Sequence, residues 1–328
     1  MTVTLAMHAN SFAKIGERLK ALALDIDVIT FEDDGRYRID GAAVAPADVE
    51  VDYVWLSQQI GNMAARDAAF DTVLATKRVD VVQTFNAGLD HPFYRKTADR
   101  GIRICNSSAQ SVAIAEYTLA QVLALFHPVA RQRQMQADKE WAVTPFREIS
   151  RTKWLIVGYG AIGGEVGKRA KAFGAEVMAI RRNPTVGDEV DRAGRLEDVP
   201  TFLPEADVIL LSCPLTDATR DLADAGFFAA AKKGAVLVNV GRGGLIDDAA
   251  LIAALDADKL ECAVLDVFRT EPLPTDDPLW THPKVRLTSH TSFAGSGVQH
   301  RWDQLFLDNI VRYTKGEPLE RVVDPADI

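Results

Sequence analysis

The chain of 328 residues has only three cysteines, Cys105, Cys213 and Cys262. They stand far apart and in no spacing typical of metal ligands, so neither a metal site nor a disulfide framework is expected. We interpret them as small buried residues of a protein that works in a reducing cytoplasm.

The sequence also lacks a long uncharged apolar run. The best candidate, residues 112–130, contains Glu116 and His127 and fits an amphipathic or buried helix better than a membrane span. The first residues show no basic stretch followed by an apolar core, so no secretory signal is expected. Positive charge is scarce as well, since the formal net charge is -9, and this disfavours a polyanionic partner such as nucleic acid.

What is present is a globular composition, with 48% hydrophobic and 25% charged residues, in a chain long enough for two domains. Short β-branched runs alternate with segments of helical periodicity, which is the pattern of parallel α/β layers. A first series of strands is expected at residues 3–7, 26–30, 51–55, 79–85 and 102–106. A helix is expected between the first two, where Phe12, Ile15, Leu19 and Leu22 recur at helical spacing.

An apolar helix is expected from Ser111 to about Arg131, and a second series of strands follows it. Its members are residues 154–157, 176–180, 208–212, 236–240, 262–267 and 285–288. Six strands in order, with helices between them, match a complete dinucleotide-binding sheet. A last helix at 298–314 and a short tail are expected to return to the first domain.

The predicted fold is therefore α/β, with two doubly wound parallel-sheet domains around a cleft. Residues 1–103 and 293–328 would form a discontinuous, flavodoxin-like substrate domain. Residues 104–292 would form a Rossmann-type dinucleotide-binding domain.

A glycine-rich turn follows the strand at 154–157, with Gly158, Gly160 and Gly163 in the spacing of a dinucleotide-binding fingerprint. The first glycine permits the tight turn, the second lets the backbone approach a pyrophosphate, and the third lets the helix pack against the sheet. The helix then begins with Ala161 and Ile162 and offers free N–H groups to the phosphates. The sequence therefore predicts a nicotinamide dinucleotide site here.

The end of the next strand carries Arg181 and Arg182, where an NAD-binding sheet normally places an acid that accepts from the ribose 2′-hydroxyl. Two cations in that place suit a 2′-phosphate, so NADP(H) is the predicted cofactor and NAD(H) stays possible. The alternative interpretation is that both arginines are solvated surface charges.

Three further segments follow strands of the second series and would lie at the same edge of the sheet. Arg242 stands between glycines, Asp266 and Glu271 follow the next strand, and His290 follows the last. Reduction of a keto acid needs a cation for the carboxylate, a proton donor for the carbonyl oxygen and a group that tunes the donor. Each residue alone is ordinary, but their order on successive strand ends favours this chemistry.

The motifs VGYGAIGG (157–164), SCPLT (212–216), NVGRGG (239–244), DVFRTEPLP (266–274) and LTSHTSFAG (287–295) make the whole chain resemble the D-isomer-specific 2-hydroxyacid dehydrogenase family. VQTFNAGLDH and ICNSSAQSVAIAEY, within residues 82–117, resemble the family's substrate loop and interdomain helix. With an arginine in place of the acid at position 181, the chain most resembles the NADPH-dependent glyoxylate/hydroxypyruvate reductase branch.

The resemblance implies an enzyme that reduces a small 2-keto acid, such as glyoxylate or hydroxypyruvate, to the D-2-hydroxy acid. Arg242 would bind the substrate carboxylate together with the backbone N–H groups of Ala87 and Gly88. His290 would be the acid/base, and Glu271 would pair with it. Further contacts to the cofactor would come from Cys213, Pro214, Val240 and Asp266.

Two residues depart from the family's pattern: Asn86 replaces a small residue in the substrate loop, and Ser289 replaces a proline before the histidine. A formate dehydrogenase is disfavoured, because that branch pairs its histidine with glutamine. A dinucleotide-sensing corepressor on the same fold stays an alternative, which turnover of a keto acid would exclude. A homodimer is expected, paired through the helix at 111–131, with Trp141 at an interface.

Overall fold

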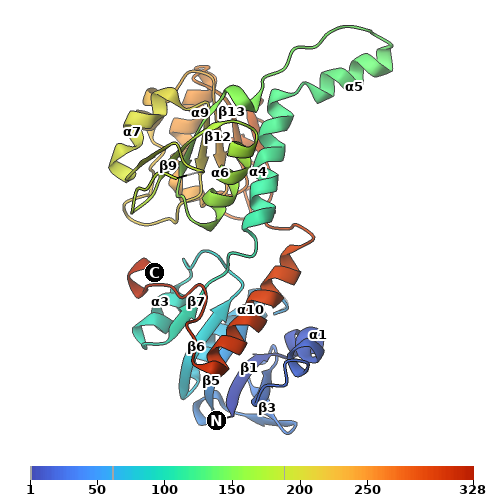
Figure 1. Cartoon of the computed structure of the whole chain (residues 1–328), viewed down its shortest axis with the longest axis vertical. Helices are drawn as coiled ribbons and strands as arrows, with labels where there is room; N and C mark the ends of the chain where they lie inside the picture. The colour runs from blue at the N-terminus through green and yellow to red at the C-terminus, as the bar shows by residue number, and fades with distance from the viewer. Residues whose placement is uncertain (1, 61–62, 188) are drawn as a thin grey trace. The chain divides into compact units, whose positions relative to one another are not determined.

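The computed structural model describes residues 2–60, 63–187 and 189–328, which form two compact units of α/β type (Figure 1). The first unit comprises Met1–Ala109 and Ser296–Ile328, and the second comprises Gln110–Gly295. The boundaries lie a few residues later in the chain than the sequence pattern places them, since the first unit extends to residue 109 and the second to residue 295.

The first unit is built on a seven-stranded sheet with the order β4-β3-β2-β1-β5-β6-β7. Its strands are β1 Val3–His8, β2 Ile26–Phe31, β3 Tyr37–Ile39, β4 Ala42–Val44, β5 Glu50–Leu56, β6 Arg78–Thr84 and β7 Arg103–Cys105. The parallel strands β2, β1, β5, β6 and β7 follow the flavodoxin-like order. The antiparallel pair β3 and β4 was not predicted, because each strand has only three residues and shows no clear alternation.

Helices cover both faces of this sheet: α1 Ala9–Lys20 and α10 Val298–Lys315 on one, and α2 Met63–Ala75 and α3 Pro92–Asp99 on the other. The C-terminal helix is fixed by an aromatic stack, in which the rings of Trp55 and Phe306 lie 4.2 Å apart. The chain then returns to the sheet, where the Val323 N–H donates to the Ile104 carbonyl at 2.9 Å. Residues from both ends of the chain therefore share one core.

The second unit has a seven-stranded parallel sheet with the order β10-β9-β8-β11-β12-β13-β14. Its strands are β8 Lys153–Val157, β9 Glu176–Ile180, β10 Arg192–Gly194, β11 Val208–Leu211, β12 Ala235–Asn239, β13 Leu260–Leu265 and β14 Val285–Leu287. This is the Rossmann order with one more strand at the end. The six predicted strands are confirmed. The strand β10 was not predicted, because it has only three residues, Arg-Ala-Gly, and no apolar run.

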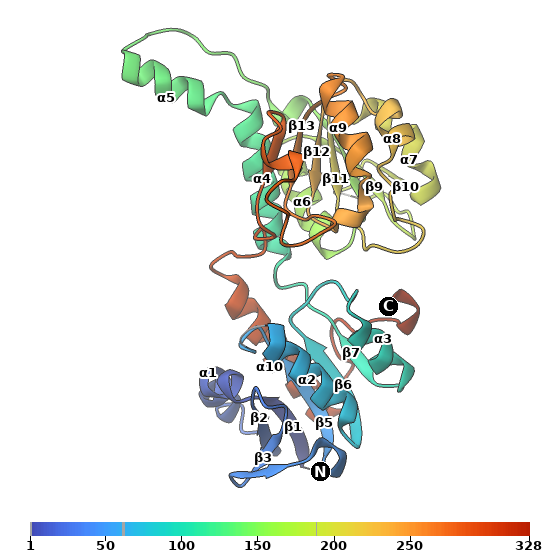
Figure 2. The same ribbon diagram turned by 180° about the vertical axis from the view of Figure 1, so that it is seen from behind.

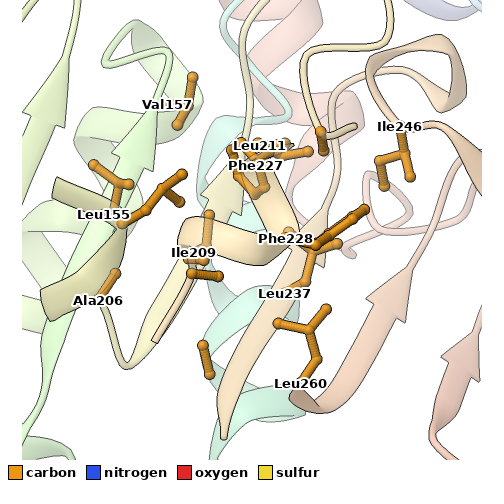
Figure 3. Close-up of a cluster of buried hydrophobic side chains, with 14 of the residues drawn as sticks. Leu155, Val157, Ala206, Ile209, Leu211, Phe227, Phe228, Leu237, Ile246 and Leu260 are labelled. Carbon is orange, nitrogen blue, oxygen red and sulfur yellow. The ribbon is translucent and has the colours of Figure 1, made fainter. Parts of the chain in front are cut away.

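Both faces of this sheet are also covered: α7 Val199–Phe202, α8 Ala225–Ala230 and α9 Asp248–Asp256 on one, and α4 Ser111–Phe126 and α6 Ala161–Ala172 on the other. Figure 3 shows the first of these cores, where Phe227 of α8 lies near Leu211 and Phe228 near Leu237. Burial on both faces explains why the strands read as continuous apolar runs.

The predicted helix at 111–131 is wrong in its extent. The helix α4 ends at Phe126, and the next residue is extended, as residues before proline usually are. A separate helix, α5, spans Val129–Asp138, and it extends away from the sheet of the second unit in both views (Figures 1 and 2). Within the described part of the chain no single helix is long and apolar enough to cross a membrane, although α4 and α5, bent by 52°, meet the length and composition criteria as a pair.

Candidate active site

In the glycine turn after β8, two of the glycines have no space for a side chain, and the third faces open space. Gly158 has a φ of +98°, and a Cβ there would lie 2.4 Å from the backbone nitrogen of Cys213. A Cβ on Gly163 would lie 2.3 Å from the Gly158 carbonyl oxygen, whereas a Cβ on Gly160 would meet nothing within 4 Å. The backbone is therefore accessible at Gly160, where a phosphate group would approach.

The helix α6 begins at this turn, with Ala161 and Ile162 as its first residues. The first N–H groups of a helix have no partners within the helix, and the helix dipole makes this end attractive to anions. No acidic side chain stands in the first turn of α6 to oppose an anion. The accessible backbone at Gly160 and this helix start together fit the pyrophosphate of a dinucleotide.

Two arginines stand at the end of β9. The Arg181 guanidinium lies over the Tyr159 ring, 5.6 Å from its centroid, and its Nη2 donates to the Thr185 carbonyl at 2.6 Å. Gly167 leaves space for that ring, because a Cβ on Gly167 would lie 2.4 Å from the Tyr159 hydroxyl. Arg182 is exposed beside them. The stacking places Arg181 next to the glycine turn.

Cys213 and Pro214 follow β11, and Val240 follows β12, at the same edge of the sheet as the glycine turn. Cys213 forms part of the wall against which Gly158 turns, and burial raises the pKa of its thiol to about 11. All three cysteines of the chain are buried free thiols. Among the described residues no three His, Cys, Asp or Glu side chains are grouped as metal ligands.

Arg242 lies in a turn that its neighbours fix. The Asn239 side chain spans this turn: its Nδ2 donates to the Arg242 carbonyl at 2.9 Å, and its Oδ1 accepts from the Gly241 N–H at 3.1 Å. The Arg242 Nη1 donates to the Gly241 carbonyl at 2.7 Å. A Cβ on Gly243 would lie 1.9 Å from the carbonyl carbon of Phe268, so the turn touches the segment that follows β13.

That segment carries Glu271, and the structure brings it to His290. The Glu271 Oε2 lies 2.7 Å from the His290 Nδ1, while the Oε1 accepts the Phe268 N–H at 2.9 Å. Both side chains are partly exposed, His290 by 44% and Glu271 by 36%. The carboxylate therefore fixes the ring's orientation and favours a proton on Nδ1, so that Nε2 is the nitrogen able to face a substrate.

Asp266 is fully buried, and its carboxylate faces the segment around His290. It accepts the Thr288 hydroxyl at 2.6 Å and the N–H groups of Thr291 and Ser292 at 2.9 and 3.0 Å. The residue predicted to contact the cofactor thus makes its hydrogen bonds within the chain to the neighbours of the histidine.

Ala87 and Gly88 belong to the first unit, in the loop after β6. The Asn106 Nδ2 donates to the Ala87 carbonyl at 2.8 Å and ties this loop to the end of β7. Asn86, which departs from the family pattern, donates from its Nδ2 to the phenol oxygen of the buried Tyr94 at 2.7 Å. Its amide therefore anchors the loop to its own unit.

Sequence reasoning missed Tyr117 and Thr288, whose hydroxyl oxygens lie 2.8 Å apart. Tyr117 stands in the apolar helix α4, and Thr288 follows β14 directly. The available signal was the polar hydroxyl of a tyrosine in a largely apolar helix, since the hydroxyl of a half-buried tyrosine usually finds a hydrogen-bond partner.

The fold and the site define a two-unit α/β protein with a Rossmann-type dinucleotide-binding unit and a histidine–carboxylate pair at its sheet edge. The sequence model of the D-isomer specific 2-hydroxyacid dehydrogenase NAD binding domain matches residues 119–292. The chain belongs to this family.

Similar proteins agree with this assignment. The D-3-phosphoglycerate dehydrogenase of Methanocaldococcus jannaschii is 32% identical over 264 residues, which cover 79% of this chain and 50% of that enzyme, so the chain spans about half the length of this relative. The hydroxypyruvate reductase of Thermotoga maritima is 31% identical over 244 residues, covering 73% and 78% of the two chains. The structure of a D-isomer specific 2-hydroxyacid dehydrogenase from Xanthobacter autotrophicus in complex with NADPH and MES covers 99% of each chain, with a TM-score of 0.76 and 25% identity.

Proposed function

We propose that this chain reduces a small 2-keto acid of the glyoxylate or hydroxypyruvate type to the D-2-hydroxy acid, with NADPH as the preferred hydride donor. The observation that carries the proposal is the 2.7 Å contact between His290 Nδ1 and Glu271 Oε2, at the sheet edge that also carries the glycine turn. A histidine beside a carboxylate is well suited to protonate a carbonyl oxygen. The nicotinamide, when bound, would supply the hydride.

The chain's own residues would bind the acid and move one proton. Arg242 would take the substrate carboxylate with its guanidinium fork. The proton on His290 Nε2 would pass to the carbonyl oxygen, while Glu271 would stabilise the imidazolium and hold the ring. In the reverse direction the same nitrogen would accept the proton of the substrate hydroxyl.

The preference for NADPH rests on Arg181 and Arg182 at the end of β9. A 2′-phosphate is a dianion that an arginine fork takes with parallel, charge-assisted hydrogen bonds. The stacking of Arg181 on Tyr159 reduces the side-chain entropy lost on binding. The NADPH complex of the Xanthobacter relative supports this preference. NADH would still bind, because the glycine turn contacts the pyrophosphate that both cofactors share.

A panel of 2-keto acids assayed with NADPH and with NADH tests the proposal. We expect higher kcat/KM for glyoxylate and hydroxypyruvate than for pyruvate and phenylpyruvate, and higher values with NADPH. Oxidation of D-3-phosphoglycerate belongs in the panel, because it is the reaction named for the archaeal relative. If the protein turns over none of these acids, the proposal is overturned. If it turns over D-3-phosphoglycerate alone, the proposed substrate class is wrong and D-3-phosphoglycerate replaces it.

We propose in addition that the active form is a cytoplasmic homodimer. Beyond α5, Trp141 and Val143 are almost fully exposed, and apolar side chains of this size favour burial against a protein partner. The segment that carries Trp141 and Val143 is anchored to the second unit at Arg147. The Arg147 guanidinium lies over the Phe126 ring at 4.4 Å and pairs with Asp207 at 2.7 Å. Light scattering should show a dimer for the wild type and a monomer for Trp141→Asp/Val143→Asp, and a monomeric wild type would exclude this assembly.

A further inference from the structure

The buried carboxylate of Asp266 collects hydrogen bonds from both sides of His290. Thr288 donates its hydroxyl from two residues before the histidine, and Thr291 and Ser292 donate their N–H groups from just after it. Asp266 has no exposed surface, and these donors compensate its charge. The segment 288–292 is therefore folded around one carboxylate.

The backbone of His290 needs this support. Its φ of +47° lies in the left-handed region that side chains other than glycine rarely adopt. Its N–H donates to the Asp266 carbonyl at 2.8 Å. A residue in such a conformation persists only where its surroundings over-determine it, and here the surroundings are the donors to Asp266.

Tyr117 extends this network by one step, from the helix α4. Thr288 uses its hydroxyl proton on the Asp266 carboxylate, so the proton between Tyr117 and Thr288 must come from the phenol. Burial, and to a smaller extent the charge of Asp266, raise the pKa of Tyr117, which keeps that proton in place. The result is a one-directional chain from the Tyr117 hydroxyl through the Thr288 hydroxyl to the carboxylate.

We propose that Tyr117 and Thr288 are positioning residues, which set the orientation of the His290 imidazole through Asp266. The inference rests on the proposed function, in which His290 transfers the proton. The phenol polarises the Thr288 hydroxyl and strengthens its bond to the carboxylate. Without the phenol the segment loosens, and the imidazole spends less time in its contact with Glu271.

Kinetics of three variants test the proposal. Tyr117→Phe removes one oxygen and should lower kcat by about three- to tenfold, with the KM of the acid and the Kd of NADPH unchanged. Thr288→Val should be slower still, and Thr288→Ser, which keeps the hydroxyl, should approach the wild type. Because both residues act through one chain, Tyr117→Phe/Thr288→Val should be no slower than Thr288→Val alone.

Two control variants remove comparable hydroxyls elsewhere. Tyr313→Phe removes a phenol that donates to Asp80 in the first unit at 2.7 Å. Thr118→Val removes a buried hydroxyl that returns to the Ile114 carbonyl within α4 at 2.9 Å. Both controls should leave kcat unchanged. A loss in the controls equal to that in Tyr117→Phe would reduce the effect to general destabilisation and overturn the proposal.

The ring of His290 can also be observed without substrate, by ¹⁵N NMR of protein labelled in its histidines, with the signals assigned from His290→Gln. At a pH where the ring is neutral, the wild type should hold the proton on Nδ1, facing Glu271. Tyr117→Phe should give a mixture of tautomers, and Tyr313→Phe should not. A changed spectrum without keto-acid turnover would sink the proposed function and support the positioning role. An unchanged spectrum in Tyr117→Phe would overturn the positioning role, whatever the turnover.

Discussion

Alanine at two glycines of the turn after β8 should affect two different properties: the stability of the fold in one variant and the affinity for the cofactor in the other. In Gly163→Ala the new Cβ would lie 2.3 Å from the Gly158 carbonyl oxygen and 2.9 Å from the Ile156 Cγ2. The first contact is with backbone, so α6 must move away from β8. Overpacking of this kind costs about 1–3 kcal/mol, and we expect about 2–3 kcal/mol here. For a domain the size of the second unit, this lowers Tm by about 4–12 °C.

In Gly160→Ala the methyl group meets nothing within 4 Å, and the φ of -91° lies outside the left-handed region that favours glycine. The fold should lose less than about 1 kcal/mol, the cost of a less favourable N-cap residue. The Kd of NADPH should rise by about tenfold or more, because the methyl occupies the side from which a pyrophosphate approaches the backbone.

Thermal melts and NADPH titrations of the two variants separate the two effects. Wild-type affinity for NADPH in Gly160→Ala would show that the dinucleotide does not lie on this turn. A wild-type Tm in Gly163→Ala would contradict the close approach of α6 to the glycine turn.

The remaining predictions concern the charges of the site and Asp248, the first residue of α9. Arg242→Ala should lower kcat/KM by about 10- to 150-fold, with the Kd of NADPH kept, because a charge-assisted contact is worth about 1.5–3 kcal/mol; retained efficiency would place the substrate carboxylate elsewhere. Glu271→Gln should lower the kcat of reduction, because the His290 ring loses the carboxylate that orients it from 2.7 Å away; an unchanged kcat would refute the pairing. Arg181→Asp should reverse an NADPH preference of about 10- to 100-fold in Kd, and added salt should reduce the preference of the wild type. Equal affinities of the wild type for NADPH and NADH would show that the two arginines are only surface charges. Burial and two neighbouring aspartates raise the pKa of Asp248 from 3.8 to about 6, so its ionisation costs stability as pH rises through that range; Asp248→Asn should raise Tm at about pH 8 and not at about pH 4, and equal gains at both would contradict this.

The fold was predictable from the sequence where strands are long and buried on both faces. The runs around Val157 and Val238 are mostly apolar and lie beside glycines, which marks central parallel strands. The short strands β3, β4 and β10 were not predictable, because they add to sheet edges whose pairing is decided by tertiary contacts. Pro128 indicates a break in the helix after Phe126. The break was not predicted, because apolar residues on both sides of the proline suggest a single helix.

The candidate site also contains residues that the sequence predicts and residues that it does not. Arg242, Glu271 and His290 were found because each follows a recognisable strand, and parallel strands bring their ends to one edge. The partners of Asp266 could not be found, because a network that joins α4 to the end of β14 depends on how the helix lies on the sheet. Sequence spacing carries no information on that packing.

The central claim is that His290 passes a proton to a 2-keto acid while the dinucleotide supplies the hydride. The measurement that tests it most directly is the single-turnover rate of NADPH oxidation by glyoxylate or hydroxypyruvate, in the wild type and in His290→Gln, with NADPH affinity measured on both. We predict that His290→Gln binds NADPH like the wild type and loses about 10²- to 10⁴-fold in rate. A rate in His290→Gln within a few-fold of the wild type would contradict the claim.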